Sequence, residues 1–218
     1  MEAECLQQLG FHNVDVLGHM RPLALTPRSW GERSGLLFVG SVMTMDSPNY
    51  DSLCWFVDEV LPLIEQTLGW RTRLTIAGFV SDDATLDRFR GHPRVTLRGA
   101  VADLAPLYDA HRVFIAPTRY AAGLPYKICE AASFGLPVAA SELLRRQLGW
   151  SNEQDILAAD SADPAAFARQ VLALYQSEPL WRRIRAGAAE RIRTECGDAA
   201  CEQVLSAILR SPSQGCFE

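Results

Sequence analysis

The sequence predicts an α/β protein built on a Rossmann-like, doubly wound parallel sheet. From residue 35 to about residue 160, short apolar runs alternate with helical patterns, which is typical of parallel strands with helices on both faces of the sheet. Glycines close two of these runs, at Gly40 and Gly99. Ligands of such folds bind at the carboxyl ends of the strands. The loops expected to carry function are therefore residues 40–49, 99–102 and 117–124.

Six short apolar runs are the expected strands, and together they predict a mainly parallel sheet of about six strands over residues 35–160. They are Leu36–Val39, Arg73–Ala77, Val95–Leu97, Val113–Ala116, Leu136–Ala140 and Ile156–Ala158. The fourth run is stopped by a proline, which cannot donate to a strand ladder.

The segments between these runs have a helical period or helix-start signals. The expected helices of the sheet region are Ser52–Leu68, with a kink or restart at Pro62, then Asp82–Phe89, Ala102–Ala110, Pro125–Phe134, and one that Ser141 caps and that runs to Leu148. The chain is then helical. Two further helices are expected to start at Asp163-Pro164 and at Ser177-Glu178-Pro179, where a capping residue precedes proline, and a last one covers residues 199–209.

Residues 1–34 do not open such a fold. They hold one strand-like piece, Val14–Leu17, followed by Pro22, Pro27 and a polar stretch. We interpret them as a linker and the remnant of a preceding domain. The domain itself is expected to cover residues 35–195, and residues 196–218 form a C-terminal helix and tail.

The composition excludes several classes of protein. The 218 residues carry a net charge of −5, and the lack of a basic patch argues against nucleic-acid binding. No apolar run reaches the roughly 20 residues of a membrane helix. Acidic residues follow Met1 where a secretory signal needs a basic and then an apolar region, so a cytoplasmic location is expected.

The cysteines and histidines predict no metal centre or disulfide framework. The six cysteines form no Cys-x-x-Cys pair, and the four histidines are scattered, so zinc spacing is missing. The cysteines are expected to be reduced, as in cytosolic proteins. They are Cys5, Cys54, Cys129, Cys196, Cys201 and Cys216.

The densest chemical signal is a strand, a glycine loop and a helix start over residues 116–130. Gly123 permits a sharp turn and close approach to a ligand, and Pro125 suits the first helical position. The helix start favours an anion, and Lys127, in its first turn, can reach that anion. Glu130 projects from the same side of the helix and can accept hydrogen bonds from two adjacent hydroxyls. The alternative is an ordinary solvated ion pair between Lys127 and Glu130.

The basic residues weigh against that alternative. Of 21 basic residues 20 are arginine, and the single lysine is Lys127. Its place in the first turn after the glycine loop makes it the leading candidate for an anion contact.

Residues 113–141, VFIAPTRYAAGLPYKICEAASFGLPVAAS, resemble the C-terminal domain of GT-B glycosyltransferases, in the large group that includes family 4. Two further stretches, LLFVGSVMTMDSPNYDSLCWFVDEVLP and VTLRGAVADLAPLYDAHRVFIAP, resemble the opening and the middle of that domain. The resemblance covers about residues 35–195.

The resemblance implies that a nucleotide-diphosphate sugar is the donor substrate and that no metal or cofactor is needed. By position, Lys127 would meet the diphosphate, with Arg119 as a second phosphate partner, and Glu130 would meet the ribose. Gly40 and Ser41 would line the pyrophosphate. The nucleotide-sugar-binding residues implied are Gly40, Ser41, Gly99, Val101, Arg119, Gly123, Leu124, Pro125, Lys127 and Glu130, with Gly99 and Val101 near the base.

The resemblance also implies a partner domain. In the family the acceptor and any general base come largely from an N-terminal domain of roughly 150 residues or more. Without it, catalytic residues stay unassigned, the acceptor is unknown, and the chain alone is expected to show no sugar transfer. The full-length protein is expected to act in bacterial polysaccharide biosynthesis, peripheral to the inner membrane.

Two positions depart from the family pattern. Ala122 replaces the glutamate that usually holds the donor sugar, and Ser41 stands where many members carry a basic residue. These departures favour a second hypothesis, a stand-alone module that binds a nucleotide or nucleotide sugar without turnover. A third, a sugar-nucleotide epimerase of the same fold, is disfavoured by residues 123–130.

The last predicted helix has an apolar face. It is formed by Ala199, Ala200, Val204, Leu205, Ile208 and Leu209. Without a preceding domain this face would lack its usual partner. The helix is therefore expected to pack on its own domain, to be poorly ordered, or to mediate self-association.

Overall fold

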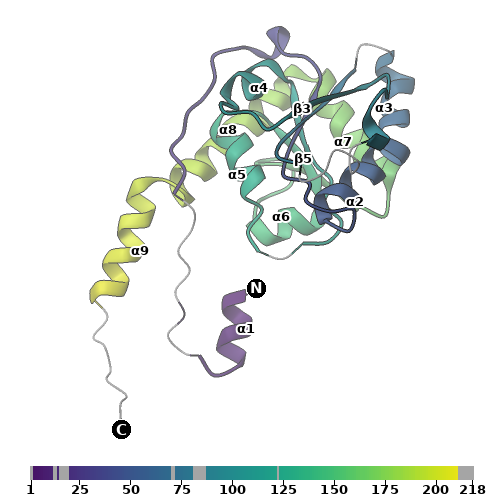
Figure 1. The fold of residues 1–218 in the computed structure, drawn as a ribbon. Coiled ribbons are helices and arrows are strands. Elements are labelled where there is room, and N and C mark those ends of the chain that lie inside the picture. The colour runs from purple at the N-terminus through teal and green to yellow at the C-terminus, as the bar shows by residue number, and fades with distance from the viewer. Residues whose placement is uncertain are drawn as a thin grey trace.

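The computed structural model describes residues 2–11, 14, 20–69, 72–80, 87–121 and 123–210. In these residues six strands form one sheet, in the order β3-β2-β1-β4-β5-β6, and every neighbouring pair is parallel. Helices cover both faces (Figure 1). The predicted doubly wound Rossmann-like fold is thereby confirmed, with the strand order of the two-halved nucleotide-binding fold.

The strands lie where the apolar runs predicted them. They are β1 (Leu36–Val39), β2 (Leu74–Ala77), β3 (Val95–Gly99), β4 (Val113–Ala116), β5 (Val138–Ser141) and β6 (Leu157–Ala159). The largest difference is at β5, which begins two residues later than predicted. The amide of Leu136 is bonded to the carbonyl of Ala131, so this residue still belongs to the turn after the preceding helix.

The strand order places a switch point between β1 and β4. From β1 the chain builds outward to β2 and β3, and from β4 it builds the other way to β5 and β6. The loops after β1 and β4 therefore diverge to opposite faces of the sheet. A crevice at such a point, outside the carboxyl ends of the strands, is where this class of fold binds ligands.

The core has two layers, because alternate strand residues point to opposite faces. On one face Leu36 and Phe38 pack with Phe56 and Phe167. On the other face Leu37 lies in a cluster with residues of the helices that follow β4 and β5. Both faces of every central strand are buried, which is why the strands read as continuous apolar runs.

The helices connect and cover these strands. They are α1 (Glu2–Gln8), α2 (Pro48–Trp55), α3 (Leu61–Leu68), α4 (Ala105–Ala110), α5 (Tyr126–Ser133), α6 (Glu142–Leu148), α7 (Pro164–Gln176), α8 (Glu178–Glu195) and α9 (Asp198–Arg210), with a 3-10 turn η1 (Trp30–Glu32) and a π-helical segment η2 (Phe56–Val60). The helix predicted over residues 52–68 starts four residues earlier, because Ser47 caps it by accepting the amide of Tyr50 (3.3 Å). It restarts at Leu61, next to Pro62, as predicted.

Other helices differ in extent from the predictions. Helix α4 starts three residues later than expected, with Pro106 in its first turn. Helix α1 was not predicted. Most of the predicted helix Asp82–Phe89, and all but the first residue of the strand-like Val14–Leu17, lie outside the described residues.

Residues 20–34 pack against the sheet domain. The Arg33 side chain is fully buried, and its guanidinium donates to the carbonyls of Tyr108 (2.7 Å) and Arg28 (2.9 Å) and to the hydroxyl of Thr26 (2.8 Å). The backbone of Thr26 is bonded to that of Phe134. This segment thus contributes to the domain's packing; that it is the remnant of a preceding domain stays a prediction.

The C-terminal helix lies at the periphery. Helix α9 contacts α8 and extends away from the sheet (Figure 1). Leu205, Ile208 and Leu209 on it are 42%, 37% and 83% exposed. Self-association through this helix stays a prediction. None of the helices in the described residues is long and apolar enough to cross a membrane.

Candidate functional site

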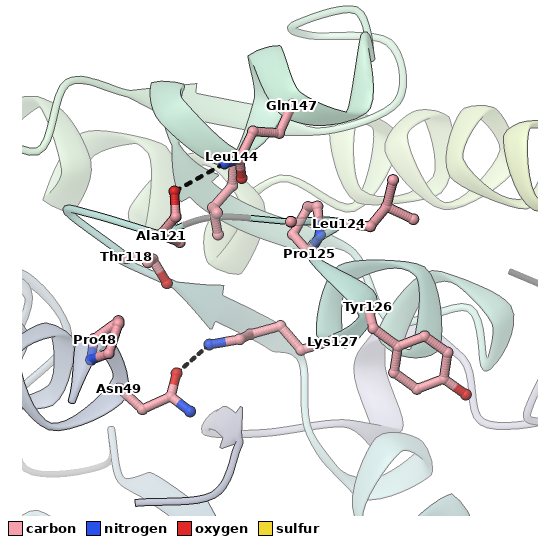
Figure 2. Close-up of a pocket in the computed structure, with 11 residues that line it drawn as sticks. Pro48, Asn49, Thr118, Ala121, Leu124, Pro125, Tyr126, Lys127, Leu144 and Gln147 are labelled. Carbon is pink, nitrogen blue, oxygen red and sulfur yellow. Dashed lines mark hydrogen bonds between the residues drawn. The ribbon is translucent and has the colours of Figure 1, made fainter. Parts of the chain in front are cut away.

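A pocket of about 290 Å³ lies at the carboxyl edge of the sheet, at the switch point between β1 and β4. Its walls come from the start of α2, the loop between β4 and α5, the start of α5, and α6 (Figure 2). The lining residues are Pro48, Asn49, Thr118, Ala121, Gly123, Leu124, Pro125, Tyr126, Lys127, Leu144 and Gln147. Four residues predicted for nucleotide-sugar binding, Gly123, Leu124, Pro125 and Lys127, are thus brought together.

The loop before α5 has the expected geometry. Gly123 has a φ of +81°, in the left-handed region that favours glycine. Pro125 has a φ of −77° and is the N-cap of α5, one position before the predicted one. No side chain caps the start of α5; the amides of Tyr126 and Ile128 bond the carbonyls of Leu124 and Pro125, and Lys127 is the second residue of the helix.

Lys127 is the main cationic group of this pocket. Its Nζ donates to Oδ1 of Asn49 and lies 4.9 Å from the centroid of the Phe38 ring. Burial lowers the pKa of Lys127 to about 8. No carboxylate of the described residues forms an ion pair with it. Figure 2 shows the side chain reaching across the pocket toward Asn49.

The loop between β1 and α2, which we call the first loop, borders the same pocket. Nδ2 of Asn49 donates to the carbonyl of Ser41 (2.7 Å), so Ser41 approaches the site through its backbone while its side chain is exposed. Gly40 leaves room for Asn49, because a Cβ at Gly40 would lie 2.9 Å from the amide nitrogen.

Arg119 is engaged differently from the prediction. Its guanidinium makes two hydrogen bonds to the carboxylate of Asp51, one of them Nε to Oδ2 at 2.8 Å. The hydrogen bond that Arg119 donates to Asp51 raises the pKa of Arg119. Arg119 does not line the pocket, and its charge is balanced by Asp51. Its role as a phosphate partner stays a prediction.

Glu130 lies beside the pocket rather than in its lining. One carboxylate oxygen accepts from Arg21 (2.8 Å) and the other from the hydroxyl of Tyr108 (3.0 Å). Burial raises the pKa of Tyr108, and the neighbouring Glu130 carboxylate raises it further. Glu130 pairs with Arg21 and Lys127 bonds Asn49, so these contacts replace the i,i+3 ion pair considered as an alternative.

The residues predicted near the base lie at the end of β3. Gly99 has a φ of +63° and its carbonyl accepts from the amide of Gly78 (2.8 Å). Val101 packs partly buried against the core. β2 and β1 separate them from the β4 side of the pocket, and neither lines it.

Seven of the eleven lining residues were not among the predicted binding residues. Among these seven, Asn49 and Thr118 were included only as members of the expected loops, and Gln147 was not singled out. The hydroxyl of Thr118 is buried and has no hydrogen-bond partner among the described residues, while Gln147 donates to the carbonyl of Ala121 (3.2 Å). The signal for Thr118 was its place directly after a buried strand and Pro117. Ala122 lies outside the described residues.

Within the described ranges, no three His, Cys, Asp or Glu side chains gather to hold a metal ion. The five cysteines that the structure describes are free thiols.

Comparisons with solved structures support the fold. A TarM structure from S. aureus, in complex with fondaparinux, alpha-GlcNAc-glycerol and UDP, matches with a TM-score of 0.74 at 14% identity, over 97% of this chain and 43% of that one. The pneumococcal O-GlcNAc transferase GtfA, in complex with UDP and GlcNAc, matches with a TM-score of 0.70 at 17% identity, over 95% of this chain and 43% of that one. The C-terminal domain of a glycosyl transferase group 1 family protein (LpcC) from Francisella tularensis matches with a TM-score of 0.62 at 9% identity, over 81% of this chain and 96% of that one.

The chain therefore spans less than half the length of TarM and GtfA, and nearly the whole of the isolated LpcC domain. No curated protein matches it by sequence. The family model "Glycosyl transferases group 1" matches residues 33–177, which hold all six strands and the complete pocket. The chain belongs to the glycosyl transferases group 1 family.

Proposed function

We propose that the pocket binds a nucleotide-diphosphate sugar as the donor of a glycosyl transfer. The observation that carries the proposal is Lys127, a partly buried ammonium at the start of α5 that lines the pocket without a carboxylate partner among the described residues. Burying a cation costs free energy unless an anion or hydrogen bonds compensate. A diphosphate supplies that compensation.

The start of α5 would hold the same diphosphate. The helix dipole at this end of α5 favours an anion, and the positive φ of Gly123 brings backbone close to the ligand. Ser41 and Gly40 would face the diphosphate from the first loop. The unpartnered hydroxyl of Thr118 is a further hydrogen-bonding group.

Glu130 would bind the ribose hydroxyls. An ionised carboxylate has about four lone-pair positions, and Arg21 and Tyr108 use two of them. The remaining positions can accept from a diol. Gly99 and Val101 would contact the base, with Arg119 as a second phosphate partner once Asp51 releases it.

The neighbours favour uridine diphosphate as the nucleotide. TarM and GtfA have structures with UDP, and Anabaena Alr3699/HepE has one with UDP-glucose. The direct test is calorimetry and thermal denaturation of the chain with UDP, GDP, TDP and ADP sugars, because a ligand of the native state raises stability by mass action. Binding of one class is the expected result. No binding of any of them at millimolar concentration would overturn the proposal.

We expect donor binding to weaken as the pH rises through 8. The pKa of Lys127 is lowered to about 8, so the free chain loses this charge progressively around that pH, whereas a bound diphosphate requires the charged form. Binding at pH 8 should therefore take up protons. Calorimetry in two buffers of different ionisation enthalpy measures this uptake. Lys127→Arg should abolish it, because arginine stays charged; equal affinity at pH 7 and 9 would contradict the assignment.

We expect the chain to bind the donor but not to transfer the sugar. We propose that a second domain binds the acceptor and supplies the general base, because this chain covers only 43% of TarM and of GtfA. The measurement is product formation by the purified chain with a bound donor and candidate acceptors. An identified glycosylated product at a robust rate would show that these 218 residues suffice.

The remaining expectations stay predictions. They concern the lack of a metal requirement, the cytoplasmic location and the role in bacterial polysaccharide biosynthesis. A donor titration with and without a chelator tests the first of them.

A further inference from the structure

Two loops that are far apart in the sequence form facing walls of the pocket, and three polar contacts join them. Asn49 bonds Lys127, and Asp51 bonds Arg119. The hydroxyl of Tyr120 donates to the carbonyl of Asp46 (2.7 Å). The start of α2 is therefore tied to the loop after β4 and to α5.

Asn49 is held on both sides of its amide. It is the second residue of α2, behind the cap at Ser47. Its Nδ2 donates to the carbonyl of Ser41 (2.7 Å), and its Oδ1 accepts from Lys127. A flipped amide would place NH₂ against the ammonium and an oxygen against the carbonyl, so both contacts select the same orientation.

Lys127 needs such a partner. A lysine side chain carries about 2 kcal/mol of rotamer entropy, and an ammonium that samples many rotamers binds an anion more weakly than one held in place. Asn49 on one side and the face of the Phe38 ring on another restrict where the ammonium can lie. Because both partners are neutral, the charge of Lys127 stays available to an anion, whereas a carboxylate in the place of Asn49 would cancel it.

We propose that Asn49 is a positioning residue that holds the Lys127 ammonium at the pocket wall and couples it to the backbone of the first loop. This inference rests on the proposed function, in which Lys127 meets the diphosphate. The ammonium has three protons; one goes to Asn49, and the others are directed by that contact toward the ligand.

The test is a double-mutant cycle on binding of the nucleotide sugar that the wild-type chain prefers. Asn49→Ala is expected to weaken binding about tenfold, which is about 1.4 kcal/mol. In a Lys127→Ala background the same change should alter affinity less than twofold, because Asn49 acts through Lys127. Asn49→Asp should weaken binding more than Asn49→Ala, since it cancels the charge. Gln66→Ala, which truncates an exposed amide on α3, is the matched control and should leave the affinity for the nucleotide sugar unchanged.

The single lysine offers a direct readout of position. Labelling with ¹⁵N- and ¹³C-enriched lysine yields one side-chain spin system, that of Lys127. Asn49→Ala should shift its ammonium signals in the free chain while the unfolding temperature stays within a few degrees; Gln66→Ala should not. A merely structural role for Asn49 would lower stability and affinity equally in both backgrounds.

The outcomes separate the two proposals. If the wild-type chain binds a nucleotide sugar and Asn49→Ala lowers the affinity equally with and without Lys127, the inference is overturned and the proposed function still stands. A wild-type chain that binds no nucleotide sugar overturns the proposed function and the inference with it. A large coupling with shifted Lys127 signals supports both.

Discussion

Replacing Lys127 with alanine is expected to weaken binding of a nucleotide-diphosphate sugar by about 1–3 kcal/mol, roughly 5- to 150-fold. The ammonium is the pocket's partly buried cation, and burial has lowered its pKa to about 8. A diphosphate bound there gains a charge-assisted hydrogen bond in a site of low dielectric, where such bonds are strong. Isothermal calorimetry with the preferred nucleotide sugar measures the difference.

The replacement should not unfold the protein, and this separates binding from stability. Removing a partly buried cation relieves its desolvation cost, so the free energy of unfolding of the Ala variant should stay near that of the wild type at pH 7. Lys127→Met keeps the apolar stem over Phe38 and isolates the loss of charge. Lys127→Arg should restore binding only in part, since the guanidinium is larger and planar. Equal affinity of wild type and both neutral variants would remove Lys127 from the site.

The sheet could be predicted from the sequence because its signal is local. Each strand is an apolar run bounded by turn residues, and strands buried on both faces keep that pattern whatever their neighbours. The same holds for the Gly123 loop and the start of α5. Helix limits were less accurate, since a single cap or proline moves them: Ser47 extends α2 toward its N-terminus, and Pro106 shortens α4.

The partners of the site residues could not be predicted, because they come from distant parts of the chain. Arg21 is 109 residues from Glu130, and Asn49 is 78 residues from Lys127. The sequence shows that a lysine and a glutamate share a helix face, but it does not show which polar side chain lies opposite. The sequence around an asparagine in a loop or an arginine in a linker is the same whether its side chain is solvated or hydrogen-bonded to a distant residue.

The segment before β1 illustrates this best. Its prolines and polar residues were interpreted as a linker, yet Arg33 is the most deeply buried charged side chain described, with 0% exposure. Burial lowers its pKa to about 10, and it remains charged at neutral pH. No local pattern distinguishes a buried arginine from a solvated one; the difference comes from the surrounding carbonyls and from the ring of Trp181, 5.2 Å away.

Replacing Trp181 with alanine is accordingly expected to lower the free energy of unfolding by about 3–5 kcal/mol, the usual cost of truncating a buried aromatic side chain. The ring is 2% exposed, its Nε1 donates to the carbonyl of Arg112 (2.7 Å), and the guanidinium carbons of Arg33 and Arg185 both lie 5.2 Å from its centroid. Domains are stable by only about 5–15 kcal/mol in total, so the loss is a large share. Equilibrium unfolding in urea, followed by circular dichroism, measures it.

Trp181→Phe is the control, because it keeps an aromatic face for the arginines and removes the hydrogen bond to Arg112. It should cost about 1–2 kcal/mol, from the unpaired carbonyl and a small cavity. Arg33 holds the segment before β1 against this ring, so the Ala variant should also be cleaved faster by protease within residues 20–34 than the Phe variant. An Ala variant that loses less than about 1 kcal/mol and keeps this segment protected would show that the ring holds neither helix α8 nor the segment in place. Because Trp181 is remote from Lys127 in the sequence and absent from the pocket lining, the affinity of the folded Ala variant for a nucleotide sugar should stay that of the wild type.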